Sequence, residues 1–215
     1  MKKKLLCMFI FFLQNINSAN LPFPYNTITL LPFDPASHFG PRQENGLKYI
    51  ITKYKPNIVI EIGSYLGAST RFIANLLPRD GKVYAVDHWL GNNEWTEDPN
   101  FQEKQSLFYK KFLSNIIHAN LCHKVIPIKM DSLTAAKKIN CQPDVIFIDG
   151  AHDYKSVYAD LCAWYPFISE KGILCGDDYY WGSSNPVKQA VDQFAREHNL
   201  VVKLIDNWFW YYERN

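Results

Sequence analysis

The fold is decided by residues 58–69, which read IVIEIGSYLGAS. Ile58–Ile62 is a short apolar run rich in β-branched residues, which is typical of a strand buried on both faces in a parallel sheet. Gly63 and Gly67 allow the backbone to turn tightly after this run, and Ser69 can cap a following helix. The stretch therefore predicts a strand, a glycine-bearing turn and a helix, the repeating unit of an α/β protein.

The same alternation recurs along the rest of the chain. The spacing of apolar residues, together with the Gly and Pro residues that end helices and strands, predicts the remaining elements. The further strands are expected at 82–86, 125–129, 144–148, 172–176, 201–205 and 208–213. The helices are expected at 42–55, 69–77, 101–118, 133–139, 154–165 and 186–198. We expect an α/β, Rossmann-like, doubly wound sheet of seven mostly parallel strands with helices on both faces. The last two strands read as a hairpin that adds an antiparallel edge strand.

Composition and charge indicate a single packed domain. The chain has 215 residues, of which 47% are hydrophobic and 20% are charged. The 23 Lys and Arg residues against 21 Asp and Glu give a net charge of +2, which offers no general electrostatic reason to bind nucleic acid. Five prolines make residues 21–41 an extended, irregular arm, so the domain proper is expected at 42–215.

Residues 1–20 have the pattern of a secretory leader. Three lysines at positions 2–4 precede a nine-residue apolar run, and Ser18-Ala19 supplies small residues for cleavage. A hydrophobic arm packed on the domain is the alternative interpretation. The leader suggests a secreted, periplasmic or membrane-tethered protein, and only this segment suggests membrane contact. No C-x-x-C pair occurs among the five cysteines, so neither a zinc site nor thioredoxin-type chemistry is indicated.

The turn after the first strand is a candidate ligand site, because open parallel sheets bind ligands at the carboxyl ends of their strands. Its glycines allow a ligand to approach the backbone closely. The turn is not a G-x-G-x-x-G motif, and Glu61 would repel a pyrophosphate, so a ligand with a cationic amine fits better. A plain strand–turn–helix that uses glycines for geometry would have the same pattern.

Polar residues also follow the second and third strands. Asp87 stands where an acidic side chain accepts hydrogen bonds from both ribose hydroxyls of an adenosine-type ligand, although a turn cap is an alternative. His88 and Trp89 come next and are expected to line an adenine pocket. Asp131 and Ser132 follow the third strand and are expected near the base, but Asp-Ser is also a routine helix cap.

Three carboxylates follow the fourth and fifth strands. Asp149 ends one strand, and Asp177 and Asp178 end the other. Carboxylates crowded together are costly unless a cation neutralises them or they share a proton, and an oxygen-rich cluster suits Mg²⁺. His152 stands close in sequence to Asp149, and an ordinary imidazole pKa of about 6.5 suits a general base. A solvent-facing Asp, a helix cap and a structural His are the alternatives.

From about Asn57 to Trp181 the chain resembles the class I S-adenosylmethionine-dependent methyltransferases. The Glu-x-Gly-x-x-x-Gly-x-Ser turn and the later run FIDGAHDY at 147–154 carry the resemblance. Both are similar to the metal-dependent catechol and caffeoyl-coenzyme A O-methyltransferases. They are also similar to the macrolide-sugar O-methyltransferases and their relatives, which we regard as the closer group. These motifs are more specific for the cofactor than for the substrate.

The resemblance implies a role for each matching residue. Those expected to contact S-adenosylmethionine are Glu61, Gly63, Ser64, Tyr65, Gly67, Ser69, Asp87, His88, Trp89, Asp131, Ser132 and Asp149. Asp149, Asp177 and Asp178 fall where these enzymes bind Mg²⁺, and His152 would be the catalytic base, as in the sugar-modifying relatives. Two positions depart from the catechol-type pattern: Asp178 stands at an Asn position, and His152 at a Lys position.

The expected function is Mg²⁺-assisted O-methylation of a small-molecule hydroxyl on a sugar, phenol or polyketide. Aromatic residues of the loop 88–100 and the helix 101–118 are expected to cover the pocket: Trp89, Trp95, Phe101, Phe108 and Tyr109. An exported, non-catalytic binding domain that retains the fold is the alternative that the leader favours, whereas a cytosolic cofactor supply favours a cytoplasmic enzyme. A nicotinamide-dependent dehydrogenase lacks its phosphate-binding turn here, and an N-P-P-Y-like motif of nucleic-acid methyltransferases is absent.

Overall fold

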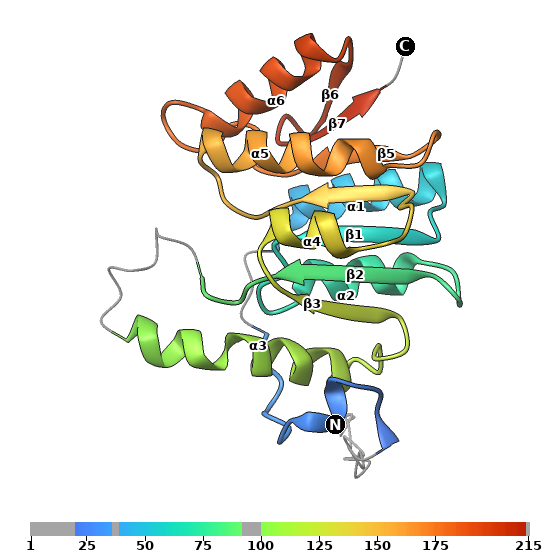
Figure 1. Ribbon diagram of the computed structural model, residues 1–215, viewed down its shortest axis with the longest axis vertical. Helices are drawn as coiled ribbons and strands as arrows, with labels where there is room; N and C mark the ends of the chain where they lie inside the picture. The colour runs from blue at the N-terminus through green and yellow to red at the C-terminus, as the bar shows by residue number, and fades with distance from the viewer. Residues whose placement is uncertain (1–19, 36–38, 92–99, 214–215) are drawn as a thin grey trace, which may run out of the picture.

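The computed structural model describes residues 20–35, 39–91 and 100–213, and a seven-stranded sheet forms its centre (Figure 1). The strand order is β3-β2-β1-β4-β5-β7-β6. The strands are β1 (Ile58–Ile62), β2 (Lys82–Asp87), β3 (Val125–Lys129), β4 (Val145–Ile148), β5 (Ile173–Gly176), β6 (Val201–Ile205) and β7 (Phe209–Glu213). The helices are α1 (Pro41–Tyr54), α2 (Ala68–Leu76), α3 (Phe101–His118), α4 (Ser132–Lys138), α5 (Tyr154–Trp164) and α6 (Pro186–Glu197), with 3-10 turns η2 (Tyr25–Thr27) and η4 (Tyr165–Phe167).

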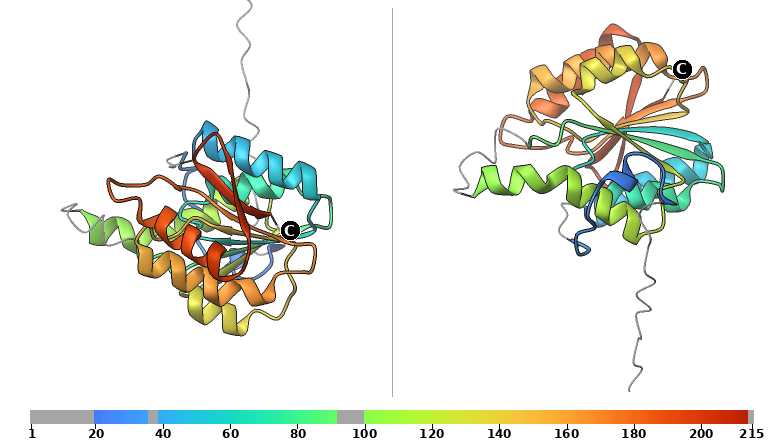
Figure 2. Two further views of the ribbon diagram at one scale, coloured as in Figure 1. Left: turned by 90° about the horizontal axis from the view of Figure 1, so that it is seen from above. Right: turned by 60° about the horizontal axis from the view of Figure 1, so that its bottom comes forward.

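Helices cover both faces of the sheet, as the alternating pattern predicts (Figure 2). One apolar core joins the sheet to α1, α2 and α3, through residues such as Ile50, Ile73 and Phe112. The other core joins the opposite face to α4, α5 and α6, through residues such as Leu161 and Phe194. Because β1 and β4 lie in the middle of the sheet between these two cores, the residues that follow them are held on a rigid support.

The C-terminal hairpin corrects one detail of the expected topology. β7 is antiparallel to its neighbours, as predicted, but it lies between β5 and β6, so that β6 forms the edge of the sheet. Burial explains the order, since Phe209–Tyr212 are buried whereas every residue of Val201–Ile205 is partly or fully exposed. A strand that is apolar on both faces needs a neighbour on both sides, and a less buried strand suits an edge.

The described part of the N-terminal arm packs against α3 instead of joining the sheet. The Asp34 carboxylate lies 2.8 Å from Lys111 Nζ, and the Leu31 amide donates to Ser114 Oγ. Tyr25 is buried, and its hydroxyl donates to the carbonyl of Val125 at 3.0 Å. The predicted leader lies outside the described residues except for position 20. Within the described ranges, none of the helices is long and apolar enough to span a bilayer.

Gly46 allows α1 to pack closely on β7, which gives a test of the packing. A β-carbon at this position would lie 2.2 Å from Cγ of Phe209. Alanine favours a helix over glycine by about 1 kcal/mol, but overpacking costs about 1–3 kcal/mol. We therefore expect Gly46→Ala to lower the free energy of unfolding in urea by up to about 2 kcal/mol.

Gly40→Ala is the matched control, because no atom lies within 4 Å of the β-carbon that it adds. Gly40 is the N-cap of α1 in an extended conformation, so alanine is a poorer cap but also restricts the unfolded chain, and these opposing effects of about 0.5–1 kcal/mol should leave the free energy of unfolding nearly unchanged. A Gly46→Ala variant more stable than the wild type would show that Phe209 moves aside at no cost, contrary to this interpretation.

Candidate active site

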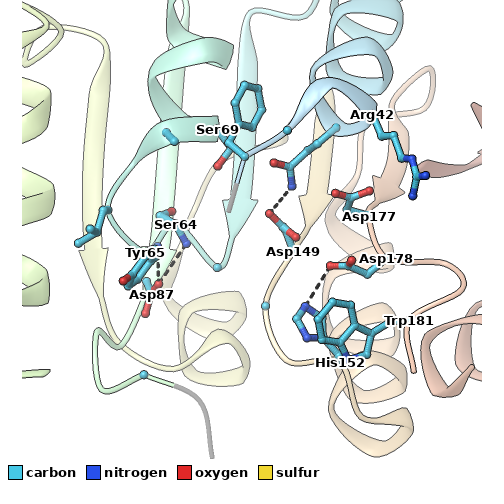
Figure 3. Close-up of a pocket in the computed structure, with 18 of the residues that line it drawn as sticks. Arg42, Ser64, Tyr65, Ser69, Asp87, Asp149, His152, Asp177, Asp178 and Trp181 are labelled. Carbon is cyan, nitrogen blue, oxygen red and sulfur yellow. Dashed lines mark hydrogen bonds and ion pairs between the residues drawn. The ribbon is translucent and has the colours of Figure 1, made fainter. Parts of the chain in front are cut away.

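A cavity of about 490 Å³ lies at the carboxyl ends of β1, β2, β4 and β5 (Figure 3). Residues from both predicted motifs line it together with residues from the start of α1 and from the hairpin. The lining consists of Phe39, Gly40, Pro41, Arg42, Gln43, Gly63, Ser64, Tyr65, Leu66, Ala68, Ser69, Asp87, His88, Trp89, Gly91, Phe108, Asp149, Gly150, His152, Asp177, Asp178, Trp181 and Trp208. The tertiary structure thus brings most of the predicted site residues to one cavity.

Glu61 fixes the turn after β1 through hydrogen bonds to its buried carboxylate. Its carboxylate is fully buried and accepts hydrogen bonds from the hydroxyls of Ser64, at 2.8 Å, and Thr70. Its Oε1 atom is buried without a hydrogen-bond partner among the described residues. Burial raises the pKa of Glu61 to about 7, although nearby hydroxyl groups oppose the rise. The side chain does not line the cavity, so its contact with a ligand amine remains a prediction.

Asp87 ties the same turn to the end of β2. Its Oδ2 atom accepts the backbone N–H groups of Ser64 and Tyr65 at 3.1 and 2.8 Å, and Oδ1 accepts the N–H of Trp89 at 2.6 Å. The indole of Trp89 is buried and donates to the carbonyl of Tyr65. A carboxylate offers about four acceptor positions, so Asp87 retains capacity for a ligand hydroxyl while it organises both loops.

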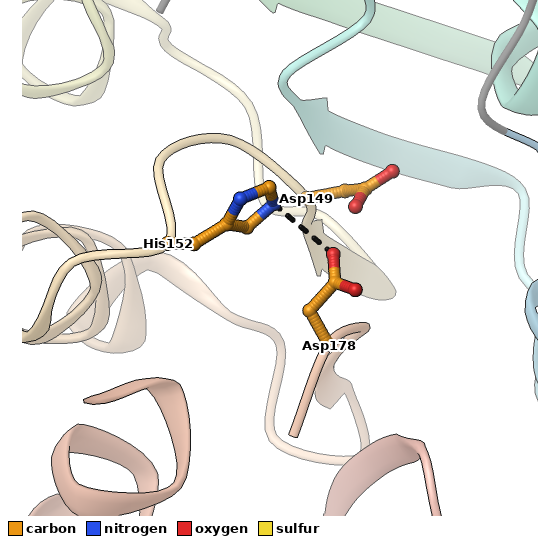
Figure 4. A group of neighbouring side chains, drawn as sticks. All are labelled: Asp149, His152 and Asp178. Atoms are coloured by element: carbon orange, nitrogen blue, oxygen red, sulfur yellow. Dashed lines mark ion pairs between the residues drawn. The ribbon is translucent and has the colours of Figure 1, made fainter. Parts of the chain in front are cut away.

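Three of the predicted site residues meet at the other end of the cavity. Asp149, His152 and Asp178 each offer a ligand atom, and these atoms lie within 4.8 Å of one another (Figure 4). The Nε2 atom of His152 lies 3.1 Å from Oδ2 of Asp178. Gln43 donates to Oδ2 of Asp149 at 2.6 Å, and the indole N–H of Trp208 donates to Oδ1 of Asp178 at 3.1 Å.

The electrostatics of this end favour a bound cation. Burial, followed by the charges of Asp177 and Asp178, raises the pKa of Asp149 well above its ordinary value. Burial and the neighbouring Asp178 also raise the pKa of Asp177 to about 7. The Oδ1 atom of Asp177 is buried, with no hydrogen-bond partner in the described part of the chain. A divalent cation would relieve this repulsion, so the residues present fit one.

The set of clustered groups differs from the predicted metal ligands in one member. The sequence suggests three carboxylates, whereas the compact group contains His152 in place of Asp177. Asp177 also lines the cavity, and its backbone carbonyl accepts the indole N–H of Trp210 at 3.1 Å. Oxygen donors suit Mg²⁺, and a histidine nitrogen also suits Mn²⁺ and other transition metals.

Several predicted contact residues have other roles in the structure and do not line the cavity. Asp131 caps α4 by accepting the N–H of Thr134, and Ser132 accepts the indole N–H of Trp164 at 2.7 Å. The contact of Asp131 matches the helix-cap interpretation of Asp-Ser, whereas that of Ser132 is a long-range contact. Gly67 has φ +81° and lies against the ring of Phe112. Contacts between these residues and a cofactor therefore remain predictions.

The aromatic cover is partly as expected. Trp89 and Phe108 line the cavity, whereas Phe101 and Tyr109 do not. Trp95 lies outside the described residues.

Sequence reasoning missed the wall formed by α1 and the hairpin. Arg42 and Gln43 come from the first turn of α1, and Trp208 comes from the turn between β6 and β7. Trp181 packs on His152, with ring centroids 4.5 Å apart. None of these residues follows a parallel strand except Trp181, and no motif marks them. A search restricted to strand ends and motifs therefore had no signal for the other three.

Comparison with known proteins identifies the family. Residues 60–179 match the family model of a methyltransferase domain. The chain belongs to the class I methyltransferases. The family predicted from the turn after β1 and the FIDGAHDY run is thus confirmed, and so is the seven-stranded fold. No curated protein matches this methyltransferase.

Solved structures of methyltransferases share the fold. An O-methyltransferase from Bacillus cereus in complex with SAH has a TM-score of 0.59 at 20% identity, over 84% of each chain. A Staphylococcus aureus protein provisionally assigned as a caffeoyl-CoA O-methyltransferase has a TM-score of 0.65 at 15% identity, over 83% of this chain and 86% of that one. TomG, a Streptomyces achromogenes O-methyltransferase of tomaymycin synthesis in complex with SAM, has a TM-score of 0.58 at 14% identity, over 83% and 80%. At these identities the likeness establishes the fold alone.

The buried Glu61 predicts a pH-dependent stability. Its pKa is about 7 in the folded protein against an ordinary value of 4.5, so the folded state holds the proton more tightly than the unfolded state. Stability from this group is therefore complete below about pH 4.5 and is lost as the pH rises through about 7. Glu61→Gln has no such loss. We expect its stability relative to the wild type to rise by up to about 3 kcal/mol between pH 4.5 and 8.

Urea denaturation of both metal-free proteins across this pH range measures the effect. All other titrating groups are shared, so the difference between the two curves reports the titration of Glu61 together with its charge coupling to Asp87 and Asp149. Two parallel curves would contradict a raised pKa at Glu61.

Proposed function

We propose that this methyltransferase transfers a methyl group from S-adenosylmethionine to a hydroxyl oxygen of a small molecule. The observation that carries the proposal is the single cavity, with Asp87 and the glycine turn at one end and the group of Asp149, His152 and Asp178 at the other. The O-methyltransferases from B. cereus and S. achromogenes share the fold and are described in complex with SAH and SAM, which supports the cofactor assignment.

The cofactor would occupy the end formed by the turn after β1 and the end of β2. Gly63 and Ser64 would face its methionine part, and Asp87 would accept its ribose hydroxyls. His88 and Trp89 would lie beside the base. The hydrogen bonds that Asp87 accepts from the backbone N–H groups of Ser64 and Tyr65 support this assignment, because they fix the conformation of the turn before a ligand binds.

The acceptor hydroxyl would lie at the acidic end. When bound there, a divalent cation supplies a positive charge that lowers the pKa of a nearby hydroxyl. Asp149 and Asp178 would hold this cation, with Asp177 beside them as the third carboxylate of the predicted set. The donor chemistry and the raised pKa values of Asp149 and Asp177 support such a site.

His152 would act as the general base. The imidazole would accept the proton of the acceptor hydroxyl, and the Asp178 carboxylate, whose Oδ2 atom lies 3.1 Å from Nε2, would stabilise the resulting imidazolium. The oxygen then forms its bond to the methyl carbon while the carbon–sulfur bond breaks and its electron pair returns to sulfur. Because the methyl donor is already activated, the chain contributes mainly alignment and the exclusion of water.

Isothermal titration calorimetry tests the cofactor assignment directly. We expect S-adenosylmethionine to bind the full chain at one site, and Asp87→Ala to weaken this binding at least tenfold, because the variant loses both the ribose acceptor and the ties to the turn. NADH is expected not to bind. A folded protein that shows no binding of S-adenosylmethionine, with or without Mg²⁺, would instead support the alternative of a non-catalytic binding domain.

The role of His152 is separable from cofactor binding. We expect His152→Ala to lower methyl transfer at least 100-fold, as loss of a general base does, while the Kd for S-adenosylhomocysteine changes less than threefold. The assay uses labelled S-adenosylmethionine and the best acceptor from a panel of sugars, phenols and polyketides. His123→Ala is the control and should retain full activity. His123 is exposed and precedes β3, at the end of the strand opposite to the cavity. Loss of cofactor binding in His152→Ala would reassign His152 to a structural role.

A further inference from the structure

The acidic end of the cavity also contains a cation, Arg42, which the proposed reaction does not use. Arg42 lies in the first turn of α1, and its side chain is exposed to the cavity beside Asp177 and Asp178 (Figure 3). Among the described residues, no carboxylate lies within 4.0 Å of its guanidinium, the limit for an ion pair. Its charge is therefore available to a ligand.

The guanidinium is held in place by an aromatic ring. It lies over the indole of Trp208, 5.1 Å from the ring centroid. The indole is itself fixed, since its N–H donates to Asp178 at 3.1 Å and the backbone carbonyl of Trp208 accepts the N–H of Tyr179 at 3.0 Å. A guanidinium that lies over the face of a fixed ring retains N–H groups that can donate to the two oxygens of an oxyanion.

Neutralising the carboxylates is the simpler role for Arg42, but the geometry does not favour it. A cation that served only this purpose would be expected to contact a carboxylate, as Lys111 contacts Asp34 at 2.8 Å. The guanidinium of Arg42 instead lies over the Trp208 ring. Burial and Asp178 still raise the pKa of Asp177 to about 7, although Arg42 and His152 act in the opposite direction. Arg42 thus offsets the repulsion only in part.

We propose that Arg42, positioned over the Trp208 ring, binds an oxyanion, a carboxylate or a phosphoryl group, on the acceptor molecule. The inference rests on the proposed function and narrows its substrate class to hydroxylated molecules that carry a negative charge. The hydroxyl would lie at Asp149, His152 and Asp178, and the oxyanion would lie on the side of the cavity formed by α1 and the hairpin. Trp181, packed on His152, offers a flat wall for the body of such a molecule.

Three matched probes test the inference: 3,4-dihydroxybenzoate, 3,4-dihydroxyphenylphosphonate and the neutral 3,4-dihydroxybenzamide. They share the ring and both hydroxyls and differ only in the third substituent. Binding to the full chain, saturated with S-adenosylhomocysteine and Mg²⁺, is measured by calorimetry at one ionic strength. We expect at least one anionic probe to bind at least tenfold more tightly than the amide, and the better of the two identifies the class of oxyanion.

Two variants assign the preference to Arg42. Arg42→Gln is expected to reduce the ratio of affinities to less than threefold while binding S-adenosylhomocysteine as the wild type does. Arg79→Gln removes an exposed arginine that precedes β2, at the end of the strand opposite to the cavity, and it should preserve the wild-type ratio. Equal binding of all three probes, no binding of any probe, or an unchanged preference in Arg42→Gln would overturn the inference alone. Failure of S-adenosylhomocysteine to bind the wild type would overturn the proposed function, and the inference with it.

Discussion

The site depends on the close approach of the backbone at Gly63 to the backbone at Asp149. A β-carbon at position 63 would lie 2.1 Å from the carbonyl oxygen of Asp149, and Gly63 has φ +91°, which side chains rarely tolerate. The N–H of Asp149 donates to the carbonyl of Ile62 at 2.8 Å, so the two strand ends remain paired up to this contact. Only glycine allows the turn after β1 and the end of β4 to share this space. The turn after β1 and the acidic residues after β4 therefore lie next to each other in the cavity. This proximity matters because a transfer reaction needs its reacting atoms about 3–3.5 Å apart.

The second constraint is the crowding of carboxylates beside this contact. Asp149, Asp177 and Asp178 come from neighbouring strands, and burial of the first two penalises their charged forms. Burying like charges without a partner destabilises a folded protein. A cation that binds only the folded state would recover part of that stability by mass action. The crowded carboxylates would therefore be stabilised by a cation that neutralises part of their charge. The cost of burying a charge is smaller at Glu61, because hydroxyl groups donate hydrogen bonds to its carboxylate.

Much of the site was predictable because of a general property of parallel sheets. All parallel strands end on the same side of the sheet, so residues that directly follow strands far apart in sequence come together there. Asp87, Asp149, His152 and Asp178 were found in this way, and all four line the cavity. The residues that were missed do not follow this rule. Arg42 and Gln43 begin a helix that precedes the first strand, and Trp208 sits in a hairpin turn, so only the packing of α1 and β7 brings them to the cavity.

The sequence by itself determined the order of strands and helices, the family and the carboxylates at the strand ends, because apolar period, glycine turns and acidic motifs are local properties of the chain. The tertiary structure alone decided which strand forms the edge of the sheet, since β7 is apolar on both faces and needs two neighbours whereas β6 does not. It also decided the partners of several polar groups. Asp131 caps α4, Ser132 accepts a hydrogen bond from Trp164, and the guanidinium of Arg42 lies over the Trp208 ring. The cap of Asp131 is local and the Asp-Ser pair indicates it, whereas the contacts of Ser132 and Arg42 join segments that are remote in sequence, and no local pattern encodes those.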